Sequence, residues 1–167
     1  KSNNFKTVAD LKGKTVVSTS GTTNIKQINE INTAQNLGIT ILPAKDHAEA
    51  FLMVETDRAQ AFVMDDILLA SLAASSKDPS LYQISEEALS VEPYGIMLRK
   101  DDPAFKKVVD DAMTAVYKSG DINAIYEKWF TKPIPPRGIT LNIPLGASFK
   151  KVIENPTSSG DPADYKS

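Results

Sequence analysis

The chain has 167 residues, an apolar fraction of 41%, no cysteine and a formal net charge of −2. This length is enough to bury the core of one or two small domains. The lack of cysteine excludes disulfides, thiolate metal sites and thiol catalysis, and the charge lacks the basic excess typical of nucleic-acid binding. No run approaches the roughly 20 apolar residues of a membrane-spanning helix.

Strand and helix signals alternate over the first hundred residues. Short apolar runs predict strands, and apolar residues at helical spacing lie between them. This alternation with short links predicts a mainly parallel sheet covered by helices, with right-handed crossovers. The expected elements are strand 15–19, helix 23–34, strand 40–42, a helix capped by Asp46 with Glu49 as its capping-box partner, strand 60–64, a helix from 65–66 to about 74, and strands near 82–84 and 94–98.

The last third is expected to be helical. Asp102 is a typical N-cap, Pro103 a typical first helical residue and Gly120 a typical stop signal. A second short helix follows, and residues 133–136 are expected to end regular structure. The apolar stripe of the long helix consists of Phe105, Val108, Val109, Met113 and Val116, and the short helix carries Ile125, Trp129 and Phe130.

Residues 19–23 (Thr-Ser-Gly-Thr-Thr) connect the first predicted strand to the first predicted helix. Free backbone N–H groups and the helix dipole attract an anion at such a place. The stretch has no lysine and lacks the GK[ST] ending of a phosphate loop, so a carboxylate fits it better. An equally simple interpretation is that these residues only cap the helix.

Polar residues follow three successive predicted strands, at 19–23, 44–47 and 65–66. Ligands of open α/β sheets bind beyond the carboxyl ends of the strands, so we expect these residues to share one edge. Hydroxyls, amides, an imidazole and a carboxylate complement a zwitterion that carries a second acidic group. The simpler interpretations are a surface position for His47 and a capping role for Asp65 or its neighbour.

Ser20, His47 and Asp65 also have the residue types of a hydrolytic triad. However, Ser20 does not lie in a G-x-S-x-G elbow, and a hydroxyl at a helix start is more often a cap than a nucleophile. We therefore expect a protein that is not an enzyme and has no catalytic residue. With one histidine and no cysteine, no metal site and no cofactor are expected either.

Seven segments carry a resemblance to a known family. They are FKTVADLKGK (5–14) with TSGTT (19–23), AKDH (44–47), AFVMDD (61–66), YGIMLRKDDP (94–103), YEKWF (126–130) and PIPP (133–136). Together they resemble periplasmic amino-acid-binding proteins of ABC importers (solute-binding protein family 3), and the glutamate/aspartate-binding subfamily in particular, over about residues 5–142. The resemblance implies a type II periplasmic-binding-protein fold: an α/β lobe 2 with a mainly parallel sheet flanked by helices, plus C-terminal helices belonging to lobe 1.

The resemblance also implies roles for single residues. The Thr22–Thr23 pair would give backbone and hydroxyl donors to a ligand carboxylate, His47 would contact the side-chain carboxylate, and Asp65 would take the α-ammonium. A carboxylate beside His47 favours the imidazolium, so we expect affinity to fall as the pH rises. The predicted ligand-binding residues are Ser20, Gly21, Thr22, Thr23, His47 and Asp65.

The expected domain organisation is incomplete relative to this family. Residues 1–93 are assigned to lobe 2, residues 94–150 to the returning segment of lobe 1 with its hinge strand and helices, and residues 151–167 to a mobile C-terminal tail. The arginine that clamps the α-carboxylate in the family belongs to the part that we expect to be missing, and no residue here replaces it. We therefore expect a fragment whose exposed helix stripe packs against a second copy, as a homodimer or by domain swapping.

The expected function is capture of glutamate or aspartate in the periplasm for the ABC permease of the inner membrane. Residues 1–4 lack the apolar stretch of a signal peptide, which is expected to lie outside this chain. Two alternatives stay open: a ligand-binding domain of a sensor or receptor with the same fold, and a dehydratase-like enzyme on this scaffold. The sequence does not rank aspartate against glutamate, because one methylene depends on the depth of the pocket.

Overall fold

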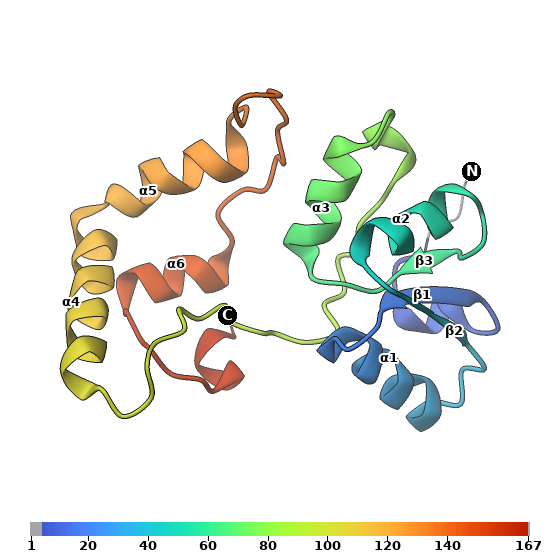
Figure 1. Cartoon of the computed structure of the whole chain (residues 1–167), viewed down its shortest axis with the longest axis horizontal. Helices are drawn as coiled ribbons and strands as arrows, with labels where there is room; N and C mark the ends of the chain where they lie inside the picture. The colour runs from blue at the N-terminus through green and yellow to red at the C-terminus, as the bar shows by residue number, and fades with distance from the viewer. Residues whose placement is uncertain (1–4, 167) are drawn as a thin grey trace. The chain divides into compact units, whose positions relative to one another are not determined.

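Two compact units make up the chain in the computed structural model (Figure 1), which describes residues 5–166. The N-terminal unit ends at Leu89 and the C-terminal unit begins at Ser90. This division lies close to the predicted boundary at 93/94, and the assignment of the parts to lobes stays a prediction. The start of the first predicted domain at residues 1–4 and the end of the predicted tail at residue 167 lie outside the described residues.

A parallel sheet of three strands forms the centre of the N-terminal unit. β1 (Thr15–Thr19) lies between β2 (Thr40–Ala44) and β3 (Ala61–Phe62) and pairs in parallel with both. The predicted parallel α/β arrangement is therefore confirmed. β2 is longer than predicted and reaches Ala44, whereas β3 is shorter than the predicted 60–64 because only two of its residues pair with β1.

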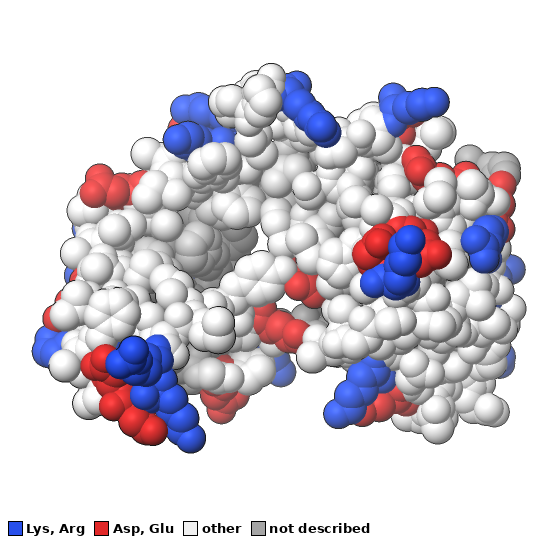
Figure 2. Space-filling view, in the orientation of Figure 1, with Lys and Arg blue, Asp and Glu red and all other residues white. Residues whose placement is uncertain are grey.

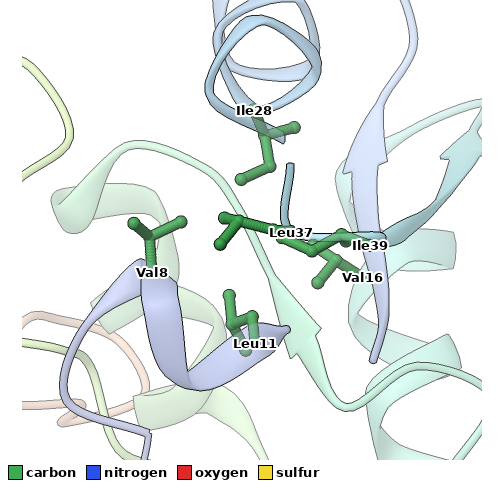
Figure 3. Packing of buried hydrophobic residues seen from close by; sticks show 6 residues of the cluster. All are labelled: Val8, Leu11, Val16, Ile28, Leu37 and Ile39. Atoms are coloured by element: carbon green, nitrogen blue, oxygen red, sulfur yellow. The ribbon is translucent and has the colours of Figure 1, made fainter. Parts of the chain in front are cut away.

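Helices cover both faces of this sheet, because successive side chains of a strand point to opposite faces. Val16 of β1 is buried with Ile28 of α1 (Thr23–Ala34), and Val17 is buried with residues of α2 (His47–Glu55). α1 and α2 thus lie on opposite sides of the sheet (Figure 1). Figure 3 shows the first cluster, which consists of Val8, Leu11, Val16, Ile28, Leu37 and Ile39.

Capping residues define where the first two long helices begin. α1 has the predicted bounds, and α2 begins after Asp46, whose carboxylate accepts the backbone N–H of Glu49 at 2.8 Å. The Glu49 carboxylate accepts the N–H of Lys45 at 2.8 Å rather than that of the N-cap. The cap is confirmed, but the reciprocal contact is shifted by one residue from the predicted capping box.

The prediction of a strand near 82–84 is wrong, because these residues are irregular. α3 (Asp66–Ser75) is followed by the 3₁₀ turn η2 (Pro79–Leu81) and then by irregular chain. Tyr82 packs its ring against that of Phe51 at 4.9 Å, and its hydroxyl donates to the Glu55 carboxylate at 3.1 Å. Its apolar surface therefore packs against α2 without joining the sheet.

The described part of the C-terminal unit consists of helices and irregular chain. α4 (Pro103–Ser119) has the predicted bounds: the Asp102 carboxylate accepts the N–H of Phe105 at 3.0 Å, and Gly120 ends the helix at a φ of +85°. α4 is followed by α5 (Asp121–Tyr126) and the π-helical turn η3 (Glu127–Thr131), which contain the predicted short helix, and then by α6 (Ala147–Glu154) and η4 (Pro162–Tyr165).

Two further predictions for this unit are wrong. Residues 94–98 form no strand, because no strand among the described residues pairs with them, and Tyr94 and Met97 are 71% and 96% exposed. Regular structure also does not end at 133–136, since α6 follows and takes in the first residues of the predicted tail. The ring of Phe149 in α6 packs against that of Tyr126 in α5, with 5.7 Å between the ring centroids, and this contact stabilises α6 against α5.

The surface is mixed in charge. Figure 2 shows basic and acidic side chains interspersed on the face that it draws, with neither sign gathered into one large patch. Among residues 5–166, no helix combines the length and the apolar character needed to cross a membrane.

Candidate functional site

The candidate site lies at the carboxyl edge of the sheet in the N-terminal unit. Because the three strands are parallel, the segments that follow them lie at the same edge, as the chain order predicts. Hydrogen bonds join these segments to the central strand. The Ser20 N–H donates to the Ala44 carbonyl at 2.8 Å, and the Ser18 hydroxyl donates to the Val63 carbonyl at 2.8 Å.

His47 lies beside the end of β1. It is the first residue of α2, is half-buried, and its Nδ1 atom lies 2.7 Å from the Thr19 hydroxyl. Thr19 is only 5% exposed, and its contact with the half-buried ring is partly buried. The single histidine of the chain is thus held by a specific partner, in contrast to the simple surface position that its sequence context also allowed.

The start of α1 combines a helix cap with a glycine turn. The Thr22 hydroxyl accepts the N–H of Ile25 at 3.3 Å and donates to the Thr19 carbonyl at 2.7 Å. The hydrogen of this hydroxyl is used there within the chain, and donation to a ligand carboxylate by the hydroxyl or by the backbone N–H groups of the helix start stays a prediction. Gly21 has a φ of +75°, which glycine adopts without steric cost.

Asp65 lies after β3 and precedes α3 without capping it through its side chain. Its carboxylate accepts a hydrogen bond from the side-chain amide of Asn24, at 2.9 Å from Nδ2. The neighbouring Asp66 accepts the N–H of Ile67 at 2.7 Å and is exposed. The two acidic residues therefore differ: the Asp65 carboxylate is tied to α1, and that of Asp66 to its own helix.

The predicted residues are brought together only in part by direct contacts. Thr19 links to His47, and Asn24 links to Asp65, so both reach the segment that joins β1 to α1. Ser20 and Gly21 are exposed on that segment. Sequence reasoning missed Asn24 and the contact of Thr19 with the imidazole. Their partners, His47 and Asp65, lie far away in the sequence. The only local signal was that Thr19 is the first residue of the Thr-Ser-Gly-Thr-Thr motif and that Asn24 follows it.

The hydrolytic arrangement considered from the sequence is not assembled. The Nδ1 atom of His47 is paired with Thr19, whereas in a triad this nitrogen would donate to the carboxylate of Asp65. The Asp65 carboxylate is paired with Asn24 instead. Within the part of the chain that the structure describes, no group of three or more histidine or acidic side chains could hold a metal ion.

Comparisons with known proteins agree with this picture. Residues 2–132 match the family described as "Bacterial extracellular solute-binding proteins, family 3". The chain is 49% identical over 157 residues to an L-glutamate/L-aspartate-binding protein of Pseudomonas aeruginosa, covering 94% of this chain and 52% of the relative. It is 43% identical over 156 residues to a glutamate/aspartate import solute-binding protein of Escherichia coli, covering 93% and 52%.

A solved structure shows the same fold. An ancestral arginine-binding protein bound to arginine is similar with a TM-score of 0.63 and 28% identity, over 75% of this chain and 54% of that one. These relatives are binding proteins, in agreement with the expectation that the chain is not an enzyme, and they do not support the sensor or dehydratase alternatives.

The chain spans about half the length of the curated relatives that it matches. The matched region nevertheless extends over most of this chain and contains the whole candidate site in the N-terminal unit. Its fold, its sequence and its non-enzymatic relatives all indicate the same family. The chain belongs to family 3 of the bacterial extracellular solute-binding proteins.

Proposed function

We propose that this chain is part of a periplasmic solute-binding protein that captures glutamate or aspartate for an ABC importer. The observation that carries the proposal is the shared edge, where the start of α1, the imidazole of His47 and the carboxylate of Asp65 all reach one segment of the fold. The names of the relatives from Pseudomonas aeruginosa and Escherichia coli support the choice of ligand.

The groups at this edge complement the charges of an acidic amino acid. Backbone N–H groups of residues 21–23, at the start of α1, suit one carboxylate, because the helix dipole favours negative charge there. The imidazole of His47 suits the other carboxylate, and the carboxylate of Asp65 suits the ammonium. Ser20 lies next to these groups on the exposed part of the same segment.

A titration of the chain with amino acids tests the ligand class. Chemical shifts in the NMR spectrum report binding even when it is weak. We expect glutamate and aspartate to shift the signals of residues 19–24, His47 and Asp65, and to bind more tightly than glutamine or arginine. Equal shifts with all four amino acids, or shifts confined to the C-terminal unit, would contradict the proposal.

Two substitutions separate the predicted roles. His47→Ala should weaken glutamate binding and leave glutamine binding little changed, because only glutamate has the second carboxylate. Asp65→Asn should weaken both, because both carry an ammonium. Asp66→Asn is the matched control: the residue is adjacent, but its carboxylate contacts its own helix. Equal losses with Asp65→Asn and Asp66→Asn would remove Asp65 from the site.

The protonation of His47 gives a further test. A charged imidazolium attracts a carboxylate more strongly than the N–H of a neutral ring does, so affinity for glutamate should fall as the pH rises and the ring loses its proton. Calorimetric titrations from acid to mildly alkaline pH measure this. An affinity that stays flat over this range would contradict a contact between the charged imidazole of His47 and a ligand carboxylate.

The cellular part of the proposal concerns location and partner. A periplasmic binding protein delivers its ligand to the permease of an ABC importer in the inner membrane. Fractionation of cells that express the full gene should place the protein outside the inner membrane, and its removal should abolish uptake of radiolabelled glutamate at low concentration. Uptake that persists without the protein would contradict the transport role.

Self-association through the C-terminal unit is the last part of the proposal. Phe105 and Val108 of α4 are 51% and 61% exposed, and they belong to the predicted apolar stripe. An exposed stripe of this kind tends to bind another surface, and a second copy offers the same surface. Light scattering should give a dimer that Val108→Lys converts to a monomer. A wild-type monomer with well-packed near-UV signals would contradict this part.

A further inference from the structure

We propose that the segment joining β1 to α1 positions two ligand-binding side chains. Thr19 orients the imidazole of His47, and Asn24 orients the carboxylate of Asp65. This inference rests on the proposed function and deepens it. Neither Thr19 nor Asn24 needs to touch the ligand for this role. Each acts through the side chain that it holds.

The Thr19 contact is short and partly buried. The hydroxyl lies 2.7 Å from Nδ1 of His47, and Thr19 is 5% exposed, so the Thr19 side of the contact is shielded from water. Within residues 5–166, Nε2 of His47 has no hydrogen-bond partner. The contact therefore engages one ring nitrogen and leaves the other for a ligand.

The chemistry of a hydroxyl explains how this contact serves ligand binding. A hydroxyl both donates and accepts, so it fits the ring in either protonation state. For the neutral ring, we assign the hydroxyl as the donor to Nδ1, which places the remaining hydrogen on Nε2. When the ring is charged, Nδ1–H donates to the hydroxyl, and Nε2 again carries a hydrogen. In both states Nε2 is a donor, which is what a ligand carboxylate requires.

The Asn24 contact orients a charge without neutralising it. The side-chain amide donates to Oδ1 of Asp65 at 2.9 Å, which restricts rotation of the carboxylate. An amide carries no charge, so Asp65 keeps the negative charge that attracts an ammonium. A lysine or arginine at position 24 would instead compete with the ammonium for that carboxylate.

The topology explains why one segment reaches both side chains. β1 is the central strand in the order β2-β1-β3, so the chain that leaves it passes between the ends of its two neighbours. The contacts join residues 28 and 41 positions apart in the sequence. Both contacts therefore depend on the same sheet, although one orients an imidazole that would bind a carboxylate and the other a carboxylate that would bind an ammonium.

NMR of the free chain tests the Thr19 contact without any ligand. The ¹⁵N signals of the imidazole should show the neutral ring with its hydrogen on Nε2 in the wild type. Thr19→Val, which keeps the shape but lacks the hydroxyl, should give a mixture of both neutral forms, and Thr19→Ser should restore the wild-type signals. Thr33→Val is the matched control, because the Thr33 hydroxyl contacts only its own helix, at the Asn29 carbonyl.

The same spectra test the Asn24 contact. The side-chain amide signals of Asn24 should move in Asp65→Asn and stay in place in Asp66→Asn. Binding gives a second readout: Asn24→Leu should weaken binding of glutamate about tenfold, the loss expected when a hydrogen bond to a charged group is removed. Binding of glutarate, which lacks the ammonium, should change little. Asn29→Leu on the same helix is the control, since the Asn29 amide contacts the Ile25 carbonyl.

Clear results would overturn the inference. Imidazole signals of Thr19→Val identical to those of the wild type, or a wild-type ring with its hydrogen on Nδ1, would remove the role of Thr19. Equal weakening of glutamate and glutarate in Asn24→Leu would mark Asn24 as merely structural. If the expected signals of the free chain are found and no amino acid binds, the proposed function fails while the two contacts stand.

Discussion

The Ser18 hydroxyl donates a hydrogen bond to the Val63 carbonyl at 2.8 Å, and Ser18 is fully buried. β3 has only two residues that pair with β1, so this contact extends the junction between the central strand and the chain that leads to Asp65. This hydrogen bond therefore stabilises the sheet and also holds the segment that leads to Asp65 against β1.

Ser18→Ala should lower the free energy of unfolding of the N-terminal unit by about 1–2 kcal/mol, because the partly buried Val63 carbonyl loses this hydrogen bond. Urea unfolding followed by NMR signals of this unit measures the change. Ser71→Ala, at an exposed position in α3, is the control and should have almost no effect. Equal effects of the two substitutions would show that the Ser18 hydroxyl contributes nothing specific.

Gly21→Ala should cost about 1 kcal/mol, because a residue with a Cβ is strained in the left-handed region. Gly21 has a φ of +75°, and a Cβ built there meets no atom within 4 Å, so the cost is backbone strain rather than a clash. Gly160, which also has open space but no positive φ, offers the control Gly160→Ala. Thermal unfolding of both variants compares them, and an unchanged Gly21→Ala would refute the strain.

Asp102→Ala should destabilise the C-terminal unit by about 1 kcal/mol, since α4 loses its N-cap. The Asp102 carboxylate accepts the N–H of Phe105 at 3.0 Å. Asp102→Asn keeps a side-chain oxygen for this bond and should be close to the wild type. Unfolding followed by the fluorescence of Trp129, the single tryptophan, reports on this unit. A loss of the same size in both variants would point to charge rather than capping.

Asp10 provides a pH test outside the candidate site. The backbone N–H groups of Thr7 and, next, Lys6 donate to its carboxylate at 2.9 Å each, and they lower the pKa of Asp10 below its ordinary value. Since the folded-state pKa is the lower one, the stabilisation is present above the unfolded-state pKa and is lost as the pH falls through the folded-state pKa. The carboxyl ¹³C signal should therefore titrate at lower pH in the folded chain than in urea, and coinciding curves would contradict this.

The sequence predicted best the elements whose signals are local. α1 and α4 have the predicted bounds, because their caps and apolar spacing are contained within a few residues. The prediction of a strand near 94–98 was wrong because a strand depends on a partner elsewhere in the chain. β-propensity at Tyr94 and Ile96 says nothing about a partner strand, and no described strand pairs with that segment. α6 lies outside the predicted elements, although Phe149 and Val152 have helical spacing, because the proline-rich stretch before it is typical of the end of regular structure.

The candidate site was predictable by position but not by contact. Parallel strands bring the segments after them to one edge, and that inference holds in the structure. The pairing of Thr19 with His47, and of Asn24 with Asp65, depends on the register of the sheet and on side-chain directions. No pattern in a single sequence encodes the register or the side-chain directions. The sequence therefore predicted His47 and Asp65 as ligand-binding residues, but it did not predict that Thr19 and Asn24 would orient them.

The central position of β1 has a consequence for how this unit opens. Within residues 5–166, β2 and β3 pair only with β1 and not with each other, so neither keeps a hydrogen-bonded neighbour once β1 is displaced. Amide protons donated to β1 from both sides are therefore exposed to solvent in the same opening event. Local unfolding of this one strand would dismantle the whole sheet, which makes the three strands a single cooperative unit in hydrogen exchange.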